Sequence, residues 1–147
     1  MASSNTQPTA SKGMRFGLWF SQLLLALVYV PAGLMKLTSP VAQVATQIPW
    51  AADVPELFLR FIGLVDLSAG LSLLLPALTR IAPRLTVFAA YGSVALQVCA
   101  LFFHISRGEY VVVPMNLVLI ALALFVAWGR TRKAPIAPRG AVATAVS

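Results

Sequence analysis

The sequence predicts an all-α integral membrane protein, a bundle of four transmembrane helices. Of its 147 residues, 59% are hydrophobic and only 10% are charged, whereas a soluble domain carries about 25% charged residues. The apolar residues gather in four runs, each near the ~20 residues that cross a bilayer as a helix. Most cations lie at the ends of these runs or in the tails, which is typical of topology signals. The net charge of +7 therefore indicates a lipid bilayer as partner and no nucleic acid.

The first element is an apolar run over about residues 16–36, preceded by a small, polar tail over residues 1–13 that is expected to be disordered. The run is longer than the roughly 7–15 apolar residues of a signal peptide, and no A-x-A cleavage site follows it, so an uncleaved first span is expected. The connection over residues 38–55 contains three prolines, which exclude one continuous helix. We expect a short amphipathic segment on the membrane surface there.

The other three spans follow with short links between them. They are predicted over about residues 57–78, 85–104 and 111–129, joined by the stretches TRIAPR and SRGEY. The membrane domain would thus cover residues 14–130. The remaining residues, 131–147, are basic and rich in Pro and Ala, and a second disordered tail is expected.

The charges on the links and tails predict the orientation. Four spans place both termini on one side of the membrane, and that side, with the TRIAPR link, holds eight Lys and Arg and no acid. The opposite side holds three Lys and Arg together with Asp53, Glu56 and Glu109. The positive-inside rule makes both termini cytoplasmic. In a bacterial inner membrane, the long connection and the SRGEY link would face the periplasm.

Each span carries one seam of small or polar residues at helical spacing, and in the third span this seam includes Gln97 and His104. Such seams are where helices pack in lipid, which accounts for most of them. At about 1.5 Å per residue, however, four polar members fall in the outward half of the bundle, and they are Tyr29, Asp66, Gln97 and Asn116. One outward-facing polar pocket is therefore expected. Its candidate ligand-binding or proton-handling residues are Asp66, Lys36, His104, Arg107, Asn116, Gln97, Tyr29 and Arg60.

Asp66 is the most informative of these, because it interrupts the apolar stretch FIGLVDLSAGLSLLLP. A charge at the bilayer centre costs roughly 2.5–3.5 kcal/mol, so Asp66 should face inward and be paired or protonated. Lys36 is the favoured partner. Arg60 is six residues away, about 240° around the helix, and does not share its face. A buried Asp that only joins helices together is the alternative. If Asp66 is functional, Asp66→Leu is expected to insert and fold at least as well as the parent chain while losing function, whereas poor insertion would indicate a structural role.

The residue types do not indicate a metal site or a cofactor site. His104 is the only histidine and Cys99 the only cysteine, whereas metal sites usually need three or four ligands. We expect no metal site and no intrinsic cofactor, since nucleotide-binding and hydrolase motifs are missing as well. His104 could simply lie among the lipid headgroups, and Cys99 is expected to be a small buried apolar residue.

Four stretches of the sequence resemble the DoxX-like family of small four-helix bacterial membrane proteins, over about residues 16–130. The family's AGxxKL turn, the acidic residue of its G-x-x-E-x-x-x-G second span and the proline that ends this span correspond to Lys36, Asp66 and Pro76. This chain has Asp where the family more often has Glu, which shortens the reach of the carboxylate. The stretches are AGLMKL (32–37), FIGLVDLSAGLSLLLPALTR (61–80), HISRGE (104–109) and NLVLIALALFVAWGR (116–130).

The resemblance implies a link to redox chemistry. The family is named after a subunit of a thiosulfate:quinone oxidoreductase, and its relatives are linked to quinone, catechol or thiol stress. It implies a membrane subunit or accessory of a redox or quinone-linked system, an oxidoreductase component with a bound quinone near Asp66, Lys36 and His104. Two alternatives stay open. One is a non-catalytic assembly partner of another protein or of a second copy. The other is a small proton-coupled transporter or lipophile-modifying enzyme that uses Asp66.

Overall fold

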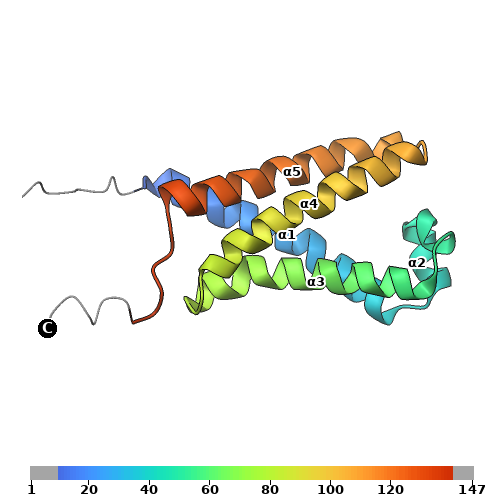
Figure 1. Cartoon of the computed structure of the whole chain (residues 1–147), viewed down its shortest axis with the longest axis horizontal. Coiled ribbons are helices and arrows are strands. Elements are labelled where there is room, and N and C mark those ends of the chain that lie inside the picture. The colour runs from blue at the N-terminus through green and yellow to red at the C-terminus, as the bar shows by residue number, and fades with distance from the viewer. Residues whose placement is uncertain (1–9, 141–147) are drawn as a thin grey trace, which may run out of the picture.

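The structure, a computed structural model, describes residues 10–140. Residues 1–9 and 141–147, which belong to the tails predicted over residues 1–13 and 131–147, lie outside this range. Within it the chain is helical and has no strand (Figure 1). In chain order the elements are α1 (Lys12–Thr38), α2 (Val41–Gln47), η1 (Pro49–Ala52), α3 (Glu56–Thr79), α4 (Arg84–Ser106), η2 (Tyr110–Val112), α5 (Val113–Trp128) and the π-helical turn η3 (Gly129–Lys133).

Four helices are long and apolar enough to cross a membrane, as the sequence predicted. They are α1, α3, α4 and the continuous run from Tyr110 to Lys133. Each is longer than the predicted window. A helix of 24 residues, the length of α3, is about 36 Å long and exceeds a hydrocarbon core of about 30 Å. The extra turns therefore reach into the polar layers, where Ser11 caps α1 by accepting a hydrogen bond from the Met14 amide at 3.1 Å.

The helices pack as two closely paired hairpins, α1 with α3 and α4 with α5, joined through α3 and α4 (Figure 1). Glycines set the separation of the first pair. A Cβ added to Gly33 would lie 2.6 Å from the Leu67 nitrogen, and one on Gly63 would lie 2.8 Å from the Lys36 Cβ. No side chain fits between these backbones, so α1 and α3 approach closely. This contact brings Lys36 and Asp66 within reach of each other.

The connection between α1 and α3 folds into a cap over one end of the bundle, which we call the cap end. Pro40 precedes α2, Pro49 opens η1 and Pro55 precedes α3, so the prolines divide the connection as expected. The cap is more than a surface helix, because Val44 and Ala51 are fully buried with Leu59 in a small apolar cluster of their own. The cap is therefore positioned by packing.

The opposite end, the terminal end, holds the start of α1 and the end of η3 (Figure 1). Here the helix continues to Lys133, beyond residue 129 where the last span was expected to stop. Residues 134–140 lie against the α3–α4 loop: the Arg139 amide donates to the Arg80 carbonyl at 2.9 Å, and Arg80 Nε donates to the Ala137 carbonyl at 3.1 Å. The expectation of disorder is thus wrong for residues 131–140, because this loop supplies backbone partners that the composition does not reveal.

Candidate functional site

A buried ion pair lies between α1 and α3 at the cap end. Lys36 Nζ lies 2.6 Å from Asp66 Oδ2, and each side chain is only 8% exposed. Lys36 is in the last turn of α1 and Asp66 is near the middle of α3. Their proximity follows from the glycine contact, since Gly33 and Gly63 each lie one turn from the pair. The partner favoured from the sequence is the one that Asp66 contacts.

Two further polar side chains meet one level deeper in the bundle. Gln97 Nε2 of α4 donates to Tyr29 Oη of α1 at 3.1 Å, and both side chains are buried. Asn116 of α5 is also buried, at 5% exposure, and its side chain makes no hydrogen bond to another residue within 10–140. Because Asn116 lines the cavity described next, its amide is available to a ligand.

These groups line one cavity of about 600 Å³. That volume is within the range of about 300–1,000 Å³ that is usual for small-molecule sites. The walls between the polar groups are apolar and include Ile62, Leu96 and Leu119. Six of the eight predicted site residues line the cavity: Tyr29, Lys36, Asp66, Gln97, His104 and Asn116.

The other two predicted residues do not line it. Arg60 Nη1 donates to the carbonyls of Lys36 at 2.5 Å and Ser39 at 2.8 Å, and its Nη2 contacts Glu56 Oε1 at 2.7 Å. Arg60 therefore satisfies the carbonyls at the C-terminal end of α1, which have no partner within the helix. It stabilises the backbone that carries Lys36. Arg107 lies above the cavity, in the rim described next.

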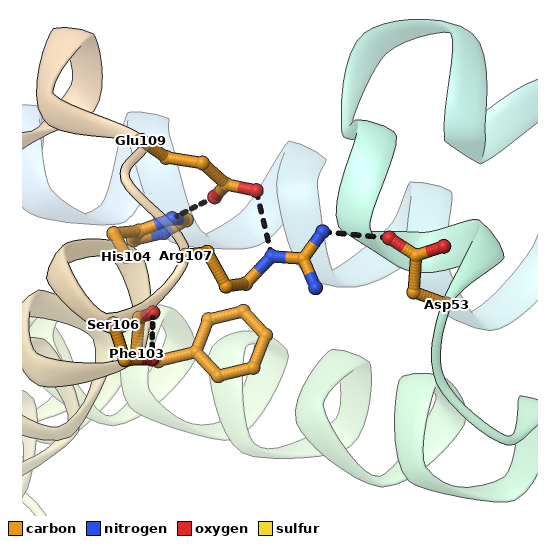
Figure 2. Close-up of polar contacts among 6 residues, drawn as sticks. All are labelled: Asp53, Phe103, His104, Ser106, Arg107 and Glu109. Atoms are coloured by element: carbon orange, nitrogen blue, oxygen red, sulfur yellow. Dashed lines mark hydrogen bonds and ion pairs between the residues drawn. The ribbon is translucent and has the colours of Figure 1, made fainter.

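The rim of the cavity is an ion-pair network, shown in Figure 2. Arg107 lies at its centre, with Nε 2.7 Å from Glu109 Oε1 and Nη2 2.6 Å from Asp53 Oδ2. The other Glu109 oxygen lies 2.6 Å from His104 Nδ1. The turn that brings Glu109 back over His104 needs Gly108, whose φ is 71°. The network joins the α4–α5 loop to the cap.

Hydrogen bonding sets the protonation of this rim. The hydrogen bond from Arg107, followed by that from His104, holds the pKa of Glu109 below its ordinary value. The hydrogen bonds to Glu109 and then Asp53 raise the pKa of Arg107. The aromatic ring of Phe103 lies below the Arg107 guanidinium, 5.4 Å from ring centre to Cζ (Figure 2). These contacts join the cap to the α4–α5 loop through charged hydrogen bonds.

A smaller cavity of about 250 Å³ adjoins the first and shares Trp50, Ile62 and His104 with it. Its other walls are apolar and include Phe58, Phe103 and Cys99. The expectation of a buried Cys99 is wrong: the side chain is exposed, because it lies off the packing seam of α4. The thiol is accessible from the side of the bundle.

Sequence reasoning missed several residues around the site. Glu109 and Trp50 line the cavity, although the sequence places Glu109 in the SRGEY link and Trp50 in the connection over residues 38–55. Only the folding of the two loops brings them there, and no spacing rule could have found them. No group of three or more His, Cys, Asp or Glu that could hold a metal occurs in the part of the chain that the structure describes.

Comparison with known proteins agrees with this architecture. A family model described as the DoxX-like family matches residues 20–126. The match covers α3 and α4 in full, most of the first and last spans, and the six predicted residues that line the large cavity. The searches among curated proteins and among solved structures found no match. Since the family model covers well over half of the chain, this membrane protein with four candidate spans belongs to the DoxX-like family.

Proposed function

We propose that this protein binds a quinone-like lipophile in the cap-end cavity, as a membrane subunit or accessory of a redox system. The observation that carries the proposal is the buried Lys36–Asp66 pair, which opens onto a cavity of about 600 Å³. Ionisable groups within a membrane are costly and usually mark substrate or proton pathways. A pair that served only to join helices would need no cavity beside it.

The polar groups of the cavity suit a ring with carbonyl oxygens. The Lys36 ammonium has three N–H donors, of which one points to Asp66 Oδ2. The Asn116 amide is unengaged within residues 10–140, and Gln97 uses one of its two amide hydrogens on Tyr29. These groups can donate hydrogen bonds to carbonyl oxygens at different points of one cavity, whereas the apolar walls contact the faces of the ring.

The adjoining smaller cavity suits an apolar tail. Its walls are formed mainly by Trp50, Phe58 and Phe103, and it opens toward the side of the bundle, where lipid would be. A ligand with its ring beside Lys36 and its hydrocarbon chain past Cys99 would enter from the bilayer. This arrangement favours a lipophile over a water-soluble substrate.

Reduction of a quinone to a quinol takes up two electrons and two protons. In the proposed role, the redox centre of a partner protein supplies the electrons, and this chain binds the ring and handles protons. Asp66 and Lys36 lie against the cavity wall, while His104 and Glu109 connect the cavity to the rim. These groups form a route by which protons could pass from the cap end to the ring.

A second candidate function, an assembly partner, is favoured by one separate observation. A groove of about 430 Å³ runs along the outside of α3 and α4. It is lined by small residues that include Ser68, Ser72 and Gly92, and a Cβ on Gly92 would meet nothing within 4 Å. Small residues on a lipid-facing groove allow a helix of another protein to approach closely.

The deciding experiment is native mass spectrometry of the detergent-purified protein, with solvent extraction of what stays bound. The parent is compared with Asp66→Asn, with Asn116→Leu and with Glu56→Gln. Glu56→Gln is the matched control, because it removes a carboxylate from the same helix away from the cavity. Asn116→Leu removes a polar wall group without breaking the ion pair.

We expect the parent and Glu56→Gln to carry a quinone or similar lipophile. Asp66→Asn and Asn116→Leu should carry about tenfold less, the effect of losing one hydrogen bond near a charged group. Equal retention by all four proteins, or no lipophile in any, would contradict the proposal. A second polypeptide retained by all four would favour the assembly role.

A further inference from the structure

A second buried cation lies at the terminal end, far from the cavity described above. Arg130 of η3 is only 5% exposed. Its Nε donates to Gln22 Oε1 of α1 at 2.7 Å, and its Nη1 lies 3.4 Å from the Ala134 carbonyl oxygen. Its Nη2 is buried and has no hydrogen-bond partner among residues 10–140. The guanidinium stacks over Trp19, 5.0 Å from the ring centre.

No acidic side chain of this protein neutralises Arg130. The sequence contains four acidic residues, and the structure pairs each of them with a cation at the cap end: Asp66 with Lys36, Glu56 with Arg60, and Asp53 and Glu109 with Arg107. The contacts of Arg130 are all to neutral groups. A buried charge without a counterion is costly, so an anion from outside the chain would stabilise this end.

Arg130 lines a cavity that could hold such an anion. The cavity is about 490 Å³ in volume and is also lined by Arg84, which makes no ion pair or side-chain hydrogen bond within residues 10–140. The remaining walls are mostly apolar and include Phe88, which is 69% exposed. One wall is the segment around Ile136, which the Arg80–Ala137 and Arg139–Arg80 hydrogen bonds hold in place.

We propose that Arg130 and Arg84 bind the phosphate group of an anionic molecule in this cavity. A guanidinium matches phosphate oxygens in geometry and charge, and Arg130 and Arg84 both line this cavity. The apolar wall along Phe88 would contact hydrocarbon if the phosphate belongs to a lipid. The orientation predicted from the positive-inside rule places this end at the cytoplasmic leaflet, where anionic lipids are abundant.

The test compares the parent with Arg130→Gln, Arg84→Gln and Arg132→Gln. Arg132 is exposed on the same turn and does not line the cavity, so Arg132→Gln removes the same net charge and serves as the control. Each protein is placed in nanodiscs of phosphatidylcholine alone or of an equal mixture with phosphatidylglycerol. Lipid retained on the protein is measured by native mass spectrometry, and thermal unfolding is followed in parallel. A further arm titrates inorganic phosphate into the phosphatidylcholine nanodiscs, against chloride at equal ionic strength.

The parent and Arg132→Gln should retain phosphatidylglycerol preferentially. Arg130→Gln should lose this preference by about tenfold, and Arg84→Gln in part. Stabilisation by inorganic phosphate that depends on Arg130, without any preference for phosphatidylglycerol, would assign the site to a free phosphate. The proposal is overturned if the parent shows neither a preference for phosphatidylglycerol nor stabilisation by inorganic phosphate. It is also overturned if Arg132→Gln loses as much of the lipid preference as Arg84→Gln does. These two outcomes do not require Arg130→Gln to fold.

Discussion

The two ends of the bundle bury a cation in different ways. At the cap end, Lys36 is neutralised by Asp66 at 2.6 Å, and both belong to helices held together by glycines. At the terminal end, Arg130 contacts Gln22, a backbone carbonyl and the face of Trp19, and none of these carries a charge. The cap end is therefore balanced within the chain, whereas the terminal end keeps a positive charge.

This difference matches the two ligands that we propose, a neutral lipophile at the cap end and an anion at the terminal end. The paired Lys36 and Asp66 have little net charge together, but the Lys36 N–H groups that do not contact Asp66 can still donate hydrogen bonds to a ligand. An arginine with neutral partners keeps its full charge, and its interaction with an anion is strong where water is excluded.

The largest expected effect on stability comes from removing one partner of the ion pair at the cap end. Because Lys36 is buried against Asp66, Asp66→Leu leaves an ammonium without a counterion and should lower the free energy of unfolding by about 3–5 kcal/mol. This prediction differs from the expectation drawn from the sequence that Asp66→Leu would insert and fold at least as well as the parent chain. The double variant Lys36→Met with Asp66→Leu should recover most of the loss. Thermal unfolding in detergent measures both, and an equal loss in the double variant would contradict the ion-pair argument.

At the terminal end, removal of Gln22, the neutral partner of Arg130, should lower the free energy of unfolding by a smaller amount. Gln22→Leu deprives Arg130 Nε of its acceptor and the Leu73 carbonyl of a donor at 2.6 Å. The expected loss is about 1.5–3 kcal/mol, the range for a hydrogen bond to a charged group. If phosphatidylglycerol is the anion, it should offset part of this loss in the parallel nanodisc measurement. An unchanged stability in both lipids would show that Gln22 does not hold Arg130.

A smaller effect should follow from separating the helices that carry the ion pair. Gly63→Ala places a methyl group 2.8 Å from the Lys36 Cβ and 3.1 Å from the Gly33 carbonyl oxygen, and this overpacking should cost about 1–3 kcal/mol. Gly92→Ala is the control, since its methyl group would meet nothing within 4 Å. It should unfold within about 1 kcal/mol of the parent. Because alanine favours a helix more than glycine does, helix propensity alone would stabilise both variants. A loss in Gly92→Ala equal to that in Gly63→Ala would therefore contradict the close-packing explanation.

The smallest effect concerns pH at the rim. The pKa of Glu109 is lowered in the folded protein by hydrogen bonds from Arg107 and His104. The ionised Glu109 therefore stabilises the folded protein above the unfolded-state pKa of about 4.3. This stabilisation is lost as the pH falls through the lower pKa of the folded state. Hydrogen exchange over residues 50–55 should accelerate below this range. Glu109→Gln should remove the pH dependence, and an acceleration that persists in this variant would place its origin elsewhere.

The sequence by itself determined the fold and most of the cap-end site. A bilayer accepts only helices whose backbone groups are satisfied internally, so four apolar runs near the required length leave one architecture. The same solvent makes an isolated Asp66 too costly, and the pairing with Lys36 follows from that cost together with the helical spacing. These inferences hold because they depend on solvent and periodicity, which are local properties of a sequence.

Tertiary structure alone decided the rest. The end of α1 needed donors for its carbonyls, and this need directs Arg60 to the backbone and away from the cavity. Loop folding brings Glu109 and Trp50 to the cavity. Arg130 has the position of a surface cation in the sequence, but the packing of α1 against η3 buries it beside Gln22. Rotation of helices and closure of loops depend on contacts between distant residues, and such contacts leave no signal in the spacing of a single chain.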